Sequence, residues 1–343
     1  MNPGLLLLRA DASEQMGTGH LMRCLGLTEF WRERGGQVLL ATHSNLEPLL
    51  ERFRAEGAEI IRPKSSPASI QEARELAAAA KNRSAKWIAL DGYHFPAEYH
   101  QRLGQGARVL LIDDNGHAGR YTADVVLDQN LTATENNYRQ RGKNTHLLLG
   151  TKYALLRREF RIAKQECSKQ AGEKTKVLVS MGGSDPENVM AKVLRAVGGK
   201  EHVEVRAVIG AGNKFFTTLR EITRQSPTPI RLETNAKMPE LMAWADIAIS
   251  AAGATLWELA FMGVPTLTVE LMDHQRPIAH AFANWGAGIN LGWHGDLQDA
   301  KIVGAMQSLL ADKARCSAMS AKGRALVDGR GSGRVFAALM DFA

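Results

Sequence analysis

The sequence has few cysteines, no long apolar run and no block of like charge. Its three cysteines, Cys24, Cys167 and Cys316, lie far apart, with no Cys-x-x-Cys pair and no histidine at metal-ligand spacing. We therefore expect reduced thiols, no bound metal and no other cofactor. No stretch approaches the ~18 apolar residues that a membrane helix needs, and "MNPGLLLLRADASEQ" lacks the cationic start of a signal peptide. These absences predict a cytoplasmic protein without membrane insertion.

The net charge is +7, from 43 Lys and Arg against 36 Asp and Glu, spread without a basic cluster. Aromatic and basic residues do not interleave as in nucleic-acid modules, so we expect no nucleic-acid partner. The length of 343 residues and the 45% hydrophobic content favour two domains with substantial cores.

Short apolar runs alternate with amphipathic segments, which is typical of βαβ units and a parallel sheet. The expected strands are 5–9, 37–41, 59–62, 86–91, 108–113 and 124–127 in the first half, and 176–181, 204–209, 230–233, 246–250 and 265–269 in the second. The expected helices of the second half are 187–197, 213–224, 254–262, 275–285, 297–311 and 331–342.

The pattern pauses at a charged, helical stretch and then restarts. We therefore predict an α/β fold with two doubly wound domains that face each other across a cleft, at 1–152 and 153–343, with a connecting segment at about 153–175.

Three strand-to-helix turns contain residues suited to a ligand. "GTGHLMR" puts His20 at the start of a helix, where open α/β sheets bind ligands, although packing or capping would also explain it. "MGGSDPENV" offers Gly182 and Gly183, then Ser184 and Asp185 as possible caps, with Pro186 at a first helical position. Such a turn suits a phosphate or is simply a well-capped tight turn.

The third turn, "AAGATLWE", places Glu258 one turn inside a helix, near enough to accept hydrogen bonds from two vicinal hydroxyls or merely to complement the helix dipole. "MDHQ" follows the next strand and contributes His274 and Gln275 to the same sheet edge. Because Walker A and a complete G-x-G-x-x-G pattern are absent, neither ATP nor a dinucleotide is expected.

Taken in order, "RADASEQMGTGHLMRCLGLT", "LLIDDNG", "GTKYALLRREF", "VLVSMGGSDPENV", "ISAAGATLWELAFMGVP" and "MDHQ" resemble the UDP-2,4-diacetamido-2,4,6-trideoxy-β-L-altropyranose hydrolases of pseudaminic acid biosynthesis. The resemblance runs from about residue 5 to about 290. The glycine turns alone recur across nucleotide-sugar enzymes of the GT-B fold, including the N-acetylglucosaminyltransferase of peptidoglycan synthesis.

The resemblance implies a GT-B-like fold of two Rossmann-like domains, with UDP held mainly by the second domain. It implies His20 as the catalytic residue and Glu258 as the ligand of the ribose hydroxyls. The implied substrate-binding residues are Gly17, Thr18, Gly19, Tyr93, Tyr153, Gly182, Gly183, Ser184, Ala252, Gly253, Ala254, Thr255, Glu258, His274 and Gln275. Two positions depart from the family: His274 stands where Asn is usual, and "DGYHF" stands where many members have Asp-His-Tyr.

The implied activity is metal-independent hydrolysis of a UDP-linked 2,4-diacetamido-2,4,6-trideoxyhexose, by C–O cleavage with anomeric inversion, in a pathway of flagellin or surface glycan glycosylation. Neutral imidazole suits His20 as the base that activates water. Asp11, Asp113 and Asp114 are each placed to orient the ring. A UDP-sugar glycosyltransferase and a non-catalytic UDP-sugar sensor remain the alternatives, and we expect a monomer.

Overall fold

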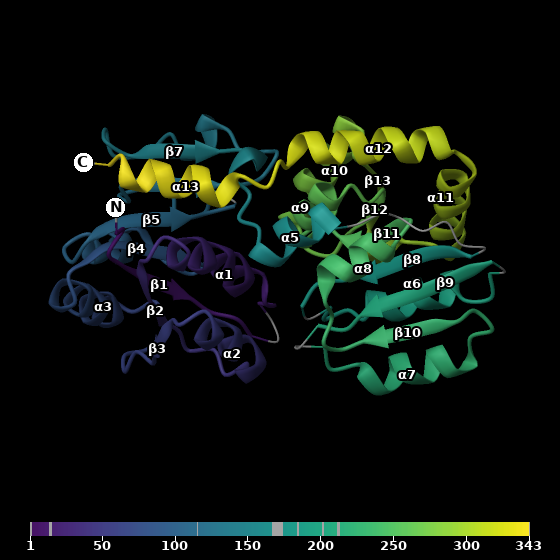
Figure 1. Ribbon diagram of the computed structural model, residues 1–343, viewed down its shortest axis with the longest axis horizontal. Helices are drawn as coiled ribbons and strands as arrows, with labels where there is room; N and C mark the ends of the chain where they lie inside the picture. The colour runs from purple at the N-terminus through teal and green to yellow at the C-terminus, as the bar shows by residue number, and fades with distance from the viewer. Residues whose placement is uncertain are drawn as a thin grey trace. The chain divides into compact units, whose positions relative to one another are not determined.

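The computed structural model describes residues 2–13, 16–114, 116–166, 174–183, 185–200, 202–210 and 213–342 (Figure 1). The chain divides into two compact units. Unit 1 contains the described residues of Met1–Ser13, His20–Arg158 and Gly329–Ala343, and unit 2 contains those of Glu14–Gly19 and Glu159–Asp328.

Unit 1 is built on a seven-stranded parallel sheet of order β3-β2-β1-β4-β5-β6-β7. Strand order reverses between β1 and β4, which in open α/β sheets marks the edge where ligands bind. The strands are β1 (Leu5–Ala10), β2 (Gln37–Ala41), β3 (Glu59–Ile61), β4 (Ala85–Asp91), β5 (Arg108–Ile112), β6 (Val125–Asp128) and β7 (His146–Leu149).

Both faces of this sheet are covered, because β1 is apolar on both sides. Leu6 and Leu8 pack into one core with α1, α2 and α13, while Leu5 and Leu7 pack into the opposite core with α3 and α4. The helices of unit 1 are α1 (Gly19–Arg32), α2 (Glu47–Ala55), α3 (Ile70–Asn82), α4 (Ala97–Leu103) and α13 (Gly331–Met340), with short 3-10 turns η1 (Glu135–Tyr138) and η2 (Thr151–Tyr153).

Unit 2 repeats this design with a six-stranded parallel sheet of order β10-β9-β8-β11-β12-β13. Its strands are β8 (Thr175–Ser180), β9 (Val203–Val208), β10 (Ile230–Glu233), β11 (Ile247–Ala251), β12 (Thr266–Glu270) and β13 (Gly288–Trp293). Its helices are α6 (Val189–Val197), α7 (Phe216–Gln225), α8 (Met238–Trp244), α9 (Thr255–Met262), α10 (Gln275–Trp285), α11 (Asp299–Ala311) and α12 (Lys313–Leu326), with the 3-10 turn η3 (His294–Asp296); α5 (Arg158–Glu166) begins at the boundary between the units.

The expected α/β architecture of two parallel-sheet domains is confirmed, and the expected strands agree with the observed ones to within two residues. The strands β7 and β13 and the helices α2, α4, α8 and α12 were not predicted from the sequence. α12 has few buried apolar side chains, among them Met319 and Leu326, so its helical periodicity is weak.

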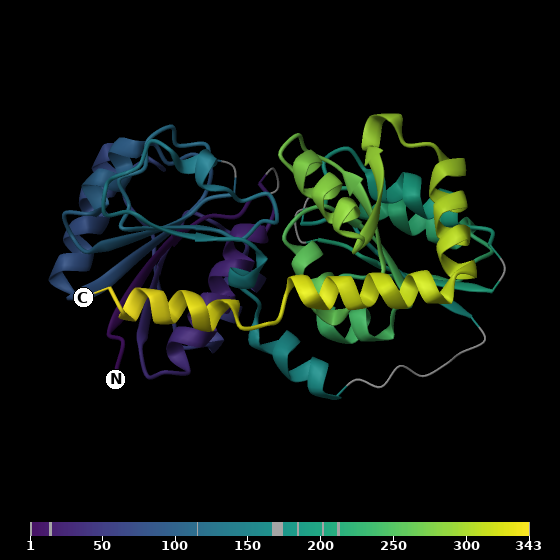
Figure 2. The same cartoon turned by 90° about the horizontal axis from the view of Figure 1, so that it is seen from above.

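The last helix corrects the expected boundary. The sequence placed 153–343 in the second domain, but α13 lies against the sheet of unit 1 (Figure 2). Phe336 on α13 meets the ring of Trp31 at 5.3 Å, and a Cβ on Gly331 would lie 2.1 Å from the Ala154 carbonyl oxygen. The order of helices and strands along the sequence does not predict that the C-terminal helix packs on the sheet of unit 1.

Candidate functional site

In unit 1, His20 lies where the sequence placed it, at the beginning of α1 beyond the carboxyl end of β1. It is only 7% exposed, and its ring meets that of Tyr93 edge to face, with 4.7 Å between centroids and 83° between planes. Among the described residues, its buried Nδ1 has no hydrogen-bond partner. Burial lowers the pKa of His20 against the attraction of Asp91 and Asp114, which favours the neutral imidazole.

A buried arginine lies one helical turn beyond His20. Arg23 Nε and Nη2 donate to the two carboxylate oxygens of Asp91 at 2.6 and 2.7 Å, and Nη1 pairs with Asp114. Asp114 also accepts the Tyr93 hydroxyl at 3.1 Å. The buried guanidinium of Arg23 is therefore paired with two carboxylates, which supply the opposite charge that a buried ion needs.

The other two aspartates expected to orient His20 have different partners. Asp11 pairs with Arg9 at 2.7 Å and accepts the Thr42 hydroxyl at 2.9 Å. Asp113 accepts the Tyr121 hydroxyl at 2.6 Å. Asp113 also lies 3.1 Å from Nδ1 of His117, whose ring meets that of Tyr93 at 5.8 Å. Asp114 differs from both in that it bonds directly to Tyr93, the residue whose ring contacts His20.

A second polar cluster at this edge was missed by the sequence analysis. Glu72 is fully buried and contacts Arg9 Nη2 at 3.0 Å, His43 Nε2 at 2.8 Å and the Tyr99 hydroxyl at 2.9 Å. The available signal was the charge of Arg9 inside the apolar strand "LLLLRA", because a buried arginine needs a buried carboxylate.

In unit 2, the first glycine turn follows β8. Gly182 has φ of +80°, a conformation that side chains rarely adopt. A Cβ on Gly183 would lie 2.8 Å from the Thr18 backbone nitrogen and 3.2 Å from Gly17 Cα, so Gly17 and Thr18 pack on this turn within unit 2. The predicted residue Ser184 lies outside the described residues.

The helix after this turn begins later than predicted, whereas one of the two predicted caps, Asp185, is confirmed. α6 begins at Val189, so Pro186 precedes the helix instead of occupying its first position. Buried Asp185 accepts the backbone N–H groups of Val189 and Met190, both at 2.9 Å. Asp185 is therefore the side chain that caps α6.

The second turn connects β11 to α9. Ala252 is buried, Gly253 and Ala254 lead to Thr255, the first residue of α9, and half-buried Glu258 lies in the first turn of that helix. This is the predicted arrangement of a carboxylate beside a helix N-terminus.

The third loop lies beside the second. Gln275 begins α10, accepts the Leu271 backbone N–H at 3.0 Å and places Nε2 3.8 Å from a Cβ built on Gly253. His274 is exposed at the N-cap of α10. The turns after β11 and β12 thus come together at the carboxyl edge of the sheet.

The remaining predicted residues divide between the units. Tyr153 ends η2 in unit 1, where it packs against the core of α1 and α13, so it does not belong to the second domain as expected. Gly19 is the first residue of α1 and groups with unit 2, while His20 groups with unit 1.

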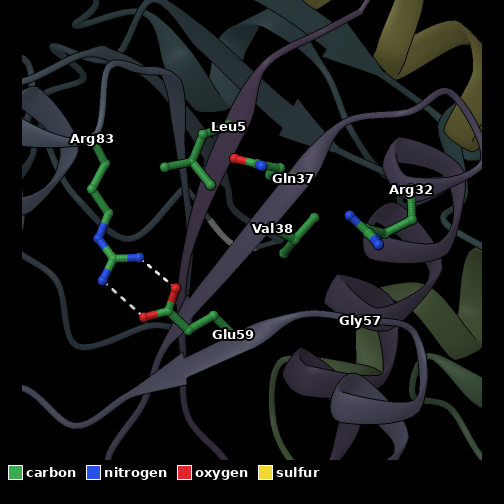
Figure 3. Close-up of a pocket in the computed structure, with 7 residues that line it drawn as sticks. All are labelled: Leu5, Arg32, Gln37, Val38, Gly57, Glu59 and Arg83. Atoms are coloured by element: carbon green, nitrogen blue, oxygen red, sulfur yellow. Dashed lines mark hydrogen bonds and ion pairs between the residues drawn. The ribbon is translucent and has the colours of Figure 1, made fainter.

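A cavity of about 460 Å³ lies elsewhere, at the amino edge of the unit 1 sheet (Figure 3). The first residues of three strands, Leu5, Gln37 and Glu59, line it, and Arg83 Nη2 donates to Glu59 at 2.8 Å. None of the predicted site residues lines this cavity.

Within the described ranges, no three His, Cys, Asp or Glu side chains are grouped to hold a metal ion. No described helix has both the length and the apolar content to cross a membrane.

The glycosyltransferase family 28 C-terminal domain matches residues 156–329, just over half of the chain and nearly all of unit 2. The chain belongs to this glycosyltransferase family. The family match covers the turns after β8, β11 and β12 described above.

Two relatives of this family 28 protein match nearly the whole chain and less than half of it, respectively. The spore coat polysaccharide biosynthesis protein SpsG of Bacillus subtilis is 26% identical over 338 residues, which cover 97% of this chain and 96% of SpsG. The UDP-N-acetylglucosamine--N-acetylmuramyl-(pentapeptide) pyrophosphoryl-undecaprenol N-acetylglucosamine transferase of Actinobacillus pleuropneumoniae is 28% identical over 154 residues, 43% of each chain. The crystal structure of Acinetobacter baumannii MurG matches with a TM-score of 0.68 at 17% identity, covering 99% of both chains. The expected GT-B-like fold is confirmed.

Proposed function

We propose that this family 28 protein transfers the sugar of a UDP-sugar to an acceptor hydroxyl in polysaccharide synthesis. The family match supports glycosyl transfer. The name of SpsG, which matches nearly the whole chain, supports a role in polysaccharide biosynthesis. The name of the Actinobacillus transferase, which matches less than half of the chain, supports a UDP-linked donor. This reverses the preference of the sequence analysis, which favoured hydrolysis.

The main support for the proposal is that the residues matched by the family include the glycine turns of unit 2. Gly182, Gly183 and the turn before Thr255 lie at the carboxyl edge of one parallel sheet, where backbone N–H groups and the N-terminus of α9 attract a diphosphate. We assign Glu258 to the ribose hydroxyls, because its carboxylate lies one turn inside that helix.

The chemistry of transfer needs one base and a stabilised leaving group. The acceptor O–H bond breaks, its oxygen forms a bond to the anomeric carbon, and the C–O bond to UDP breaks with its electron pair left on the diphosphate. We assign the proton to His20, whose buried imidazole is kept neutral. Helix N-termini at the glycine turns stabilise the departing charge. Direct displacement predicts inversion at the anomeric carbon.

Hydrolysis of a UDP-2,4-diacetamido-2,4,6-trideoxyhexose, as in pseudaminic acid biosynthesis, is the second candidate. Its support is the narrow access to His20, which at 7% exposure suits water better than a large acceptor, together with the motif order that resembles those hydrolases. The same bond breaks, and water takes the place of the acceptor.

The test measures UDP release in ¹⁸O water from UDP-N-acetylglucosamine and from UDP-diacetamido-trideoxyhexoses, with and without oligosaccharide acceptors. Transfer predicts acceptor-dependent UDP release and a glycosylated acceptor. Hydrolysis predicts acceptor-independent release with ¹⁸O in the free sugar. Label in UDP would overturn the C–O cleavage common to both, and binding without UDP release from any donor would favour a sensor.

A further inference from the structure

Arg23 is a buried residue to which the proposed chemistry gives no role. It is 4% exposed and lies three residues after His20, so both project from neighbouring positions on α1. Its guanidinium holds Asp91, the last residue of β4, through two hydrogen bonds and holds Asp114, beyond the end of β5, through a third. Arg23 therefore ties α1 to the carboxyl ends of two strands.

Asp114 extends these contacts to further segments. Its Oδ2 accepts the Tyr93 hydroxyl at 3.1 Å, and its Oδ1 accepts Asn130 Nδ2 at 3.1 Å. Its side chain is 10% exposed. The direction of the Tyr93 hydroxyl is thus set by a carboxylate that is itself held by Arg23.

Tyr93 is the side chain against which the His20 ring is packed, and within the described part of the chain no carboxylate hydrogen-bonds the buried Nδ1 of that ring. Nδ1 has no partner among the described residues, whereas the ring rests edge to face against Tyr93 at 4.7 Å. Aromatic pairs of this kind have a preferred geometry, worth ~0.5–1.5 kcal/mol beyond area burial. A change in the position of the Tyr93 ring would therefore change the orientation of the His20 imidazole.

We propose that Arg23 and Asp114 are positioning residues, which orient His20 through Tyr93 instead of through a direct carboxylate–imidazole bond. The inference rests on the proposed function for its catalytic consequence, but the geometry it describes is measurable without turnover. Of the three aspartates that the sequence offers, Asp11, Asp113 and Asp114, this proposal selects Asp114, which acts on His20 indirectly, through Tyr93.

Among the described residues, the charges of Asp91 and Asp114 raise the pKa of His20, whereas those of Arg23 and His94 lower it, and burial lowers it most. Neutralising Asp114 removes one of the two attractions. The pKa of His20 then falls further, so the loss of activity on acidification moves to lower pH.

Tyr93→Phe is the most conservative test, since it keeps the ring against His20 and removes only the hydroxyl on Asp114. Its matched control is Tyr121→Phe, because the Tyr121 hydroxyl donates in the same way to Oδ2 of the adjacent Asp113, at 2.6 Å. This variant keeps Asp113 Oδ1, which holds His117 beside Tyr93. We expect Tyr93→Phe to lower kcat at least about tenfold, with a smaller change in KM, since misplaced catalytic groups cost one to two orders of magnitude. Tyr121→Phe should leave kcat unchanged.

Asp114→Asn and Arg23→Lys separate charge from geometry. Asp114→Asn should lower kcat and move the acidic limb of the pH profile to lower pH. Arg23→Lys keeps the charge but loses the planar fork, so kcat should fall without movement of that limb. Tyr93→Phe keeps the test decisive if either charge variant fails to fold.

The same variants are compared by NMR of ¹³C-labelled histidine, with the His20 signal assigned from His20→Asn. We expect Asp114→Asn to lower the titration midpoint of His20, Tyr93→Phe to change its ring-current shift, and Tyr121→Phe to change neither. Unchanged His20 signals in Asp114→Asn and Tyr93→Phe would overturn the positioning role, as would a KM effect without a kcat effect. If wild type releases no UDP from any donor while these NMR shifts occur, the proposed function fails and the structural relation stands.

Discussion

Asp128→Asn should stabilise unit 1 at alkaline pH and not in acid. Asp128, the last residue of β6, is 1% exposed, and burial followed by the charge of Asp114 raises its pKa from 3.8 to about 7. The folded unit therefore retains a proton that the unfolded chain releases near 3.8. The contribution of the protonated carboxyl is fully present below pH 3.8 and is lost as the pH rises through about 7.

The size of this contribution to the free energy of unfolding follows from the difference between the two pKa values of Asp128. The difference between 3.8 and about 7, at ~1.36 kcal/mol per pKa unit, corresponds to roughly 4 kcal/mol. Asn130 N–H donates to Oδ1 at 3.0 Å, which an amide oxygen also accepts, but the Tyr138 hydroxyl, 2.9 Å from Oδ2, must reorient, at a cost of ~1 kcal/mol. Asp128→Asn should then gain roughly 3 kcal/mol at pH 8 and lose roughly 1 kcal/mol near pH 4.

The assay is native-state hydrogen exchange of the β5 and β6 amides at several pH values, which reports the opening of unit 1 separately from unit 2. Wild type should lose protection between pH 4 and 8 relative to the variant. Parallel pH dependence in the two proteins would refute a buried carboxyl that holds its proton to about pH 7.

Three further predictions concern individual side chains. Glu258→Ala should weaken UDP binding by ~1–3 kcal/mol, the range for lost hydrogen bonds to a charged group, and an unchanged calorimetric Kd would remove Glu258 from the ribose role. His20→Asn should lower kcat by ~10²–10⁴ while the Kd for UDP stays the same, and near-normal turnover would return His20 to packing. Asp185→Ala deprives the N–H groups of Val189 and Met190 of their acceptor, so hydrogen exchange of α6 should report a loss of about 0.5–2 kcal/mol; wild-type protection would contradict the capping role.

The sequence predicted what local periodicity encodes. Apolar runs such as Leu5–Leu8 identified the buried parallel strands, and the glycine turns placed Gly183, Gly253 and Gln275 correctly at one sheet edge. It did not place α13, because the contact of Phe336 with Trp31 joins segments about 300 residues apart in the chain.

The partners of individual side chains also could not be predicted from the sequence. The motif "LLIDDNG" showed two adjacent aspartates, but only the structure reveals that Asp114 turns toward Arg23 and Tyr93 while Asp113 turns toward Tyr121. Likewise Glu72 lies in a strongly helix-forming stretch, where a glutamate is expected to face solvent. The structure instead buries Glu72 beside Arg9.

Binding of the UDP of a nucleotide sugar by unit 2 can be measured by hydrogen exchange of the whole protein with and without UDP. We predict UDP-dependent protection of the backbone amides that follow β8 and β11, at 181–183 and 252–258, and loss of that protection in Glu258→Ala at the same UDP concentration. Protection confined to unit 1, or no change at UDP concentrations in the millimolar range, would contradict it.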